Sequence, residues 1–137
     1  MSMLNPPRFE VQAHEGNRLR LASSAGAAIE LFVLEEDIIR VLVLPQGDLR
    51  GPATWSIAPG GDDTPLEGRD RRDLSGFALP AFALHSDADT LRVETSKIRL
   101  SVALAGGFCT WQIHGAGGWQ TVLNDRPTQA YNFGYWD

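Results

Sequence analysis

Hydrophobic and polar residues alternate with a period of two along most of this chain, which is typical of half-buried β-strands. Residues 9–13 and 19–21 alternate on either side of the turn at 14–17, and residues 91–95 and 98–104 alternate further along. Alternation this regular, broken by Gly, Pro, Asn and Asp, predicts antiparallel strands joined by short turns.

Other stretches extend this pattern. Residues 38–44 are almost continuously aliphatic and predict a central strand covered on both faces. Residues 53–58 predict another strand, and residues 108–114 and 119–123 predict a hairpin around a glycine-rich turn. About ten short strands with no helical stretch indicate a sandwich or barrel. We expect an all-β, antiparallel β-sandwich, with residues 1–137 forming a single domain.

Residues 59–76 interrupt the alternation of hydrophobic and polar residues. This segment carries eight charged residues and four glycines, and it has no apolar period. A loop of this length is usually functional, disordered or in contact with another domain. We expect a mobile or domain-supporting loop, and a binding loop is the alternative.

Composition excludes several classes of protein. Apolar residues make up 43% and charged residues 21%, which is a globular composition. The net charge of -5 repels phosphate backbones, so we expect no nucleic-acid partner. Cys109 is the only cysteine, which excludes an internal disulfide and a cysteine-based zinc site, and we expect it to be buried and inert.

The chain also carries no signal for a membrane. Residues 1–8 lack the charged and apolar regions of a secretion signal. The most apolar stretch, residues 29–44, is interrupted by five charged residues and cannot form a transmembrane helix. A cytoplasmic location with no membrane partner is therefore expected.

The sequence offers few candidate metal-binding or catalytic residues. His14, His85 and His114 lie near turns, and none is spaced for metal binding, so we expect neither a metal nor a cofactor. Glycoside hydrolysis needs two carboxylates positioned across a sugar. The acidic residues considered for that role are Asp62, Asp63, Glu67, Asp70, Asp73, Asp125 and Asp137. Most lie in the charged loop, where positioning is poor, so we assign no catalytic residue.

Aromatic residues are the other candidates, because indole and phenol rings can stack on sugars. Trp55 and Trp111 fall within strand patterns and are expected in the core, and Trp119 lies in the predicted hairpin. Tyr135 and Trp136 are candidate substrate-binding residues, or else they bury against another part of a longer protein. They belong to the aromatic segment 131–137, through which we expect the chain to self-associate, and a disordered segment is the alternative.

Five motifs occur in a familiar order. They are RVLVLP at 40–45, TWSIAP at 54–59, LRVET at 91–95, IRLSV at 98–102 and DRPTQAY at 125–131. Their order and spacing resemble the N-terminal β-sandwich of glycoside hydrolase family 31, the α-glucosidase and α-xylosidase family. The resemblance covers nearly the whole chain.

The resemblance implies a galactose-mutarotase-like sandwich in front of a (β/α)8 barrel, which in that family carries both catalytic aspartates. Neither catalytic motif occurs in this chain. It therefore implies a non-catalytic domain of a retaining α-glycosidase, whose partners are the barrel and the enzyme's carbohydrate substrate. The alternative is a self-standing carbohydrate-binding module, which should expose a planar row of aromatic residues.

Overall fold

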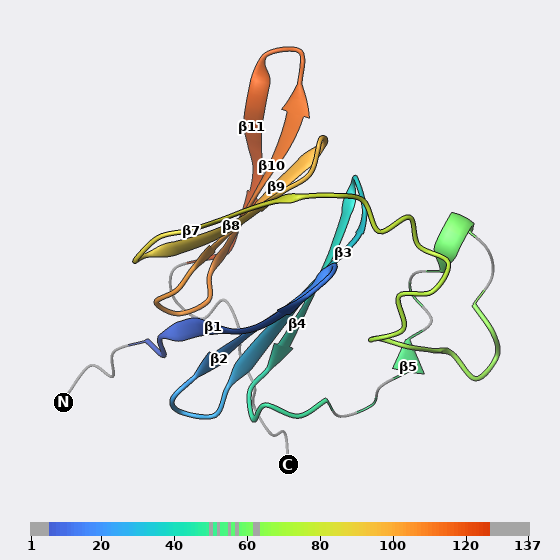
Figure 1. Ribbon diagram of the computed structural model, residues 1–137, viewed down its shortest axis with the longest axis horizontal. Coiled ribbons are helices and arrows are strands. Elements are labelled where there is room, and N and C mark those ends of the chain that lie inside the picture. Colours follow the sequence, from blue (N-terminus) through green and yellow to red (C-terminus); the bar gives the residue numbers. More distant parts are fainter. Residues whose placement is uncertain are drawn as a thin grey trace.

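The computed structural model describes residues 6–126, apart from residues 50, 52, 55, 57, 62 and 63. Within these residues the protein is built from antiparallel strands arranged as two main sheets that face each other (Figure 1). The predicted all-β, antiparallel sandwich is confirmed.

The first sheet has four strands in the order β1-β2-β3-β4, so each strand pairs with its neighbour in sequence. The turns between them are short, as the glycines and polar residues of the sequence predict. The strands are β1 (Phe9–Glu15), β2 (Arg18–Ser23), β3 (Ala28–Glu35) and β4 (Ile38–Leu44).

The second sheet has five strands in the order β11-β10-β9-β8-β7, again a simple antiparallel meander. The strands are β7 (Ala83–Ser86), β8 (Thr90–Glu94), β9 (Ile98–Ala103), β10 (Cys109–Gly115) and β11 (Gly118–Asn124). The predicted hairpin is the pair β10–β11, which extends beyond the rest of the sandwich (Figure 1).

A smaller element lies between the two sheets in sequence. It consists of β5 (Ala53–Thr54), the 3-10 turn η1 (Pro59–Gly61) and β6 (Arg69–Asp70), with β5 paired to β6. The strand expected at 53–58 is observed at Ala53 and Thr54, and Ser56 and Ala58 lie outside it. Trp55 and Ile57 lie outside the described residues.

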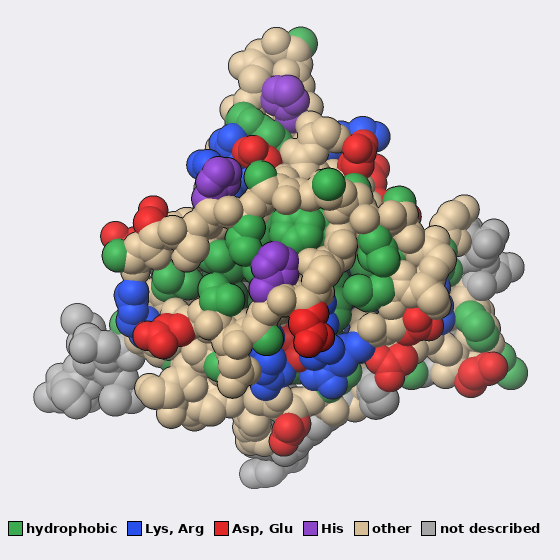
Figure 2. Space-filling view, viewed as in Figure 1, with side chains coloured by type: hydrophobic (Ala, Val, Ile, Leu, Met, Phe, Trp, Pro, Cys, Tyr) green, Lys and Arg blue, Asp and Glu red, His purple; other side chains and the backbone are tan. Residues whose placement is uncertain are grey.

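The main core fills the space between the two sheets. In the space-filling view, hydrophobic side chains occupy the centre and charged side chains lie around them (Figure 2). The buried residues of this core are Phe9, Leu19, Leu21, Ile29, Leu31, Val33, Ile39, Leu91, Val93, Ile98, Leu100, Val102, Leu104 and Cys109. Cys109 is buried, as expected from the sequence.

One strand prediction is wrong. Residues 38–44 were expected to be central, but β4 is an edge strand and most of its side chains are only half-buried. The strand covered on both faces is β3, in which every residue except Glu35 is buried. Sheet order decides this outcome: β3 lies between β2 and β4, whereas β4 pairs with one strand only among the described residues.

A second, smaller core explains why β3 is covered on both faces. Phe32 and Leu34 point away from the main core and pack with Phe77, and the half-buried Leu42 and Leu74 join them. Phe77 and Leu74 belong to the stretch after β6, so this stretch covers the outer face of the first sheet. We call residues 64–80 the covering segment.

Candidate functional site

A carboxylate is fully buried on the outer face of β3. The side chain of Glu30 has no solvent exposure and is paired with three arginines. Its oxygens lie 2.5 Å from Arg20 Nη1, 3.3 Å from Arg18 Nη2 and 2.8 Å from Arg72 Nε. Arg72 also donates from Nη2 to Oε2 at 2.9 Å, so its guanidinium binds the carboxylate with two parallel hydrogen bonds.

These cations change the pKa of the carboxyl group. Burial by itself raises the pKa of Glu30, because a charged group is poorly solvated in the interior. Hydrogen bonds from Arg72 and Arg20, together with the charge of Arg18, outweigh burial and hold the pKa below its ordinary value. Glu30 is therefore an ionised structural anchor and a poor proton donor near neutral pH.

The three arginines come from two parts of the chain. Arg18 and Arg20 are on β2, where the register places them beside β3. Arg72 belongs to the covering segment, and Arg71 of the same segment accepts a bond from Arg40 Nη1 through its backbone oxygen at 2.6 Å. The covering segment is thus attached to the first sheet by the ion pair of Arg72 with Glu30, by several hydrogen bonds and by the small apolar core.

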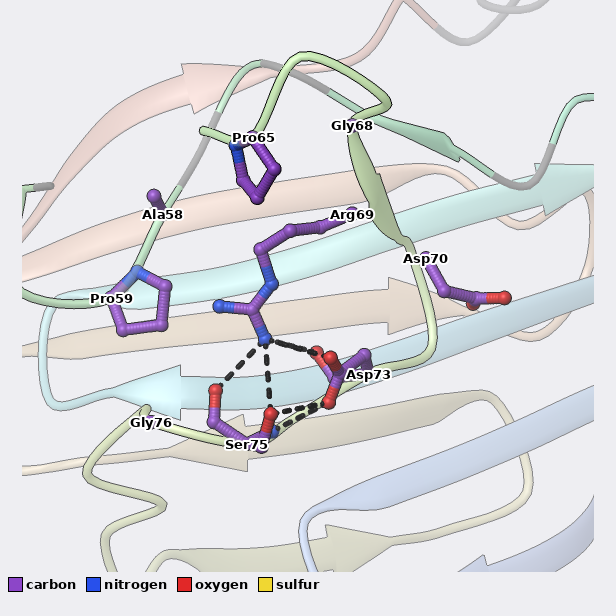
Figure 3. Close-up of a pocket in the computed structure, with 9 residues that line it drawn as sticks. All are labelled: Ala58, Pro59, Pro65, Gly68, Arg69, Asp70, Asp73, Ser75 and Gly76. Atoms are coloured by element: carbon purple, nitrogen blue, oxygen red, sulfur yellow. Dashed lines mark hydrogen bonds and ion pairs between the residues drawn. The ribbon is translucent and has the colours of Figure 1, made fainter. Parts of the chain in front are cut away.

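A depression of about 540 Å³ lies within the same region (Figure 3). The Arg69 guanidinium reaches between Pro59, Pro65 and Ser75, and it also lies over the ring of Phe77 at 5.2 Å. Nη2 of Arg69 donates to the backbone oxygen of Ser75 at 2.8 Å. This arginine holds the turn that forms the floor of the depression.

The two carboxylates that line the depression are already bound within the turn. Asp73 lies 3.2 Å from Arg69 and accepts bonds from the hydroxyl and backbone N–H of Ser75, and these bonds hold its pKa below the usual range. Asp70 accepts a bond from the backbone N–H of Arg72 and points away from Arg69 (Figure 3). In this geometry both carboxylates organise the turn.

The β10–β11 hairpin leaves apolar side chains in solvent. Ile113 is 43% exposed and Leu123 is 60% exposed. Ile113 pairs with the core residue Ile98, and Leu123 pairs with Trp111, which packs at the margin of the core. All four side chains therefore lie on the inner face of the sheet, where the first sheet does not cover the end of the hairpin. We call Trp111, Ile113 and Leu123 the open inner face.

The predicted site residues have different outcomes. Trp111 does pack against the core, although it is only half-buried. His14 is exposed and lies 5.8 Å from the ring of Phe82, and His85 is an exposed residue of edge strand β7. Tyr135, Trp136 and the rest of segment 131–137 lie outside the described residues, and so do Asp62, Asp63 and Asp137.

The structure also bears on the expectations about metal binding and membranes. Within the described residues, no group of three His, Cys, Asp or Glu side chains could hold a metal ion. The same part of the chain contains no helix of the length and hydrophobicity needed to cross a membrane. A cytoplasmic location stays a prediction.

Comparison with known proteins does not assign this chain to a family. No protein-family model matches the chain, and no curated protein matches it. The resemblance to family 31 of the glycoside hydrolases therefore stays a prediction from the motifs.

The sequence reasoning missed the arginine pairs around Glu30. A single glutamate inside an apolar strand, with Arg18 and Arg20 at alternate positions of the preceding strand, was the available signal. Arg72 had no such signal, because it is 42 residues away from Glu30 in the chain.

Proposed function

We propose that this chain is a non-catalytic domain of a retaining α-glycosidase of the family 31 type, and that it supports a (β/α)8 catalytic barrel. The motif order motivates the choice of family. The proposal rests structurally on one observation, the open inner face of the β10–β11 hairpin.

The open inner face has the properties of a domain interface. Its side chains continue the pattern of the core, since Ile113 and Leu123 stand in register with Ile98 and Trp111. Exposed apolar side chains that are contiguous usually mark a surface that another domain or protein covers. Among the described strands, β11 is also an edge strand, and it has no charged residue and no proline, so it lacks two common protections against further pairing.

The occupant we assign to this face is the barrel of the same enzyme. The acidic residues around the Arg69 depression are bound within their own turn, so the described residues offer a scaffold more readily than a pair of catalytic carboxylates. A supporting role requires an apolar surface that another domain can cover, and the open inner face offers one.

The test uses the complete reading frame that encodes this chain, expressed with and without a charge on the open inner face. The wild-type product should hydrolyse 4-nitrophenyl α-glucoside or α-xyloside, and the isolated chain should not. Leu123→Lys should lower the yield of active enzyme and its melting temperature. The control Asn124→Lys places the same charge on the opposite face of β11, where Asn124 pairs with Thr110, and should leave both unchanged.

Two results would count against the proposal. One is a complete product without α-glycosidase activity. The other is turnover by the purified isolated chain that a single aspartate substitution abolishes.

A further inference from the structure

The outer face of the second sheet carries a continuous row of bonded polar side chains. Glu94, Arg99, Gln112 and Thr121 stand opposite one another on strands β8 to β11. Arg99 Nε donates to Glu94 at 2.6 Å, Arg99 Nη1 donates to Gln112 at 3.2 Å, and Gln112 Nε2 donates to Thr121 at 3.4 Å. We call these four residues the polar row.

An aromatic pair lies beside the polar row. The Arg99 guanidinium carbon lies 4.2 Å from the centroid of the Trp119 ring. The His114 ring lies 4.9 Å from Trp119 and is tilted by 31°. Trp119 is half-buried and His114 is exposed, so part of this aromatic surface faces solvent next to amide, guanidinium and hydroxyl groups.

The same face also contains a donor without a partner. Arg92 pairs in register with Ser101, and its neighbours Leu91 and Val93 point into the core, so its side chain lies on the outer face. Within the described residues, Arg92 Nε is buried and has no hydrogen-bond partner. A buried donor that lacks an acceptor is uncommon in native proteins and requires an explanation.

We propose that this outer face binds a neutral oligosaccharide, with one sugar ring against Trp119 and its hydroxyls on the polar row. A pyranose presents C–H groups on its ring face, and an indole offers a large flat apolar surface for them. Its hydroxyls both donate and accept, which matches the amide of Gln112, the hydroxyl of Thr121 and the guanidinium of Arg99. Arg92 lies one register row beyond Glu94 and three strands from Trp119, so its buried Nε is not part of the proposed site.

Other ligand classes fit this face less well. Glu94 and Arg99 neutralise each other, and the chain has a net charge of -5, so a polyanion gains little here. A protein partner usually needs a larger apolar centre. Among the residues of β10 and β11 that pair in register, Trp119 is the one large apolar side chain on this face.

This site does not depend on the family assignment, because it lies on the face of the sheet opposite to the open inner face. The isolated chain is the material for the test. Its proton–nitrogen NMR spectrum is recorded while maltotriose, xylotriose or cellotriose is added. We expect saturable shifts of the Trp119 indole N–H and the Gln112 side-chain amide with at least one of these trisaccharides.

Substitutions complete the test. Trp119→Ala should weaken binding by at least about tenfold, which corresponds to the loss of one stacked ring. Gln112→Ala is the second variant. It retains the aromatic pair, so it tests the site even if Trp119→Ala fails to fold. Gln120→Ala is the matched control, because Gln120 pairs with Ile113 on the inner face.

Three results would overturn the proposal. The first is the absence of saturable shifts with all three trisaccharides. The second is a set of shifts that maps to the depression around Arg69. The third is binding by Trp119→Ala and Gln112→Ala that equals binding by the wild type.

Discussion

Two faces of this sandwich carry large apolar side chains beyond the main core, and they differ in what covers them. On the outer face of the first sheet, Phe32 and Leu34 are completely buried under the covering segment. On the open inner face of the β10–β11 hairpin, Ile113 and Leu123 remain largely in solvent. The covered face therefore contributes to the stability of this chain, and the open face is available to a partner.

The covered face also has a polar attachment that the open face lacks. Arg72 binds Glu30 with two parallel hydrogen bonds beneath the covering segment. Because a buried charge without a partner is costly, this attachment specifies where a highly polar segment lies. Residues 64–76 of the loop predicted at 59–76 thus pack against the first sheet, and the role of that loop in supporting another domain or binding a ligand stays a prediction.

Glu30→Gln should cause the largest loss of stability. The substitution removes the charge that balances Arg18, Arg20 and Arg72, and we expect a cost of about 3 kcal/mol, as for breaking a buried ion pair. Urea unfolding measures the change. The control Glu94→Gln breaks a half-exposed pair with Arg99 and should cost less than about 1 kcal/mol. Equal losses of unfolding free energy in the two variants would show that the buried pairs of Glu30 stabilise the fold no more than the half-exposed pair of Glu94.

Acid should act on the covered face through the same carboxylate. The pKa of Glu30 in the folded protein lies below its ordinary value, so ionised Glu30 stabilises the fold above the unfolded pKa of about 4.3. This stability is lost as the pH falls through the folded pKa. Between about pH 7 and about pH 3, the wild type should therefore lose more stability than Glu30→Gln. Parallel losses would indicate that other carboxylates dominate acid unfolding.

Trp111→Ala tests the margin between the core and the open inner face. Trp111 is half-buried, so we expect a loss of about 2 kcal/mol, below the usual 3–5 kcal/mol for a buried large aromatic. The midpoint of urea unfolding reports the change. A loss at the top of that range would place Trp111 fully in the core and would shrink the open inner face.

Leu123→Lys should have the smallest effect in the isolated chain. Leu123 is 60% exposed, so the substitution buries no charge and should change the stability by less than about 0.5 kcal/mol. Asn124→Lys is the control on the opposite face of the strand. A loss well above this value for Leu123→Lys alone would show that the isolated chain already covers the open inner face.

The strands could be predicted from the sequence because period-two alternation is a local signal. It located the β1–β2 and β10–β11 hairpins and the strands around residues 91–104. It did not distinguish β3 from β4, because burial on both faces depends on sheet order and on what packs outside. Similar aliphatic runs therefore became a central strand in one case and an edge strand in the other.

The candidate sites could be predicted only in part. Trp119 was recognised as a possible stacking residue, but its contacts with Arg99 and His114 depend on the register of three strands. The attachment of Arg72 to Glu30 joins residues far apart in sequence, and no local pattern indicates which arginine of the polar segment turns inward. Such pairs are set by tertiary packing.

A double-mutant cycle between Glu30 and Arg72 measures how strongly their ion pair attaches the covering segment to the first sheet. The wild type, Glu30→Gln, Arg72→Gln and the double variant are unfolded in urea under the same conditions. We expect a coupling energy of at least about 1 kcal/mol, as for residues in direct contact within one network. A coupling energy of zero within error would contradict the account, because the two side chains would then act independently.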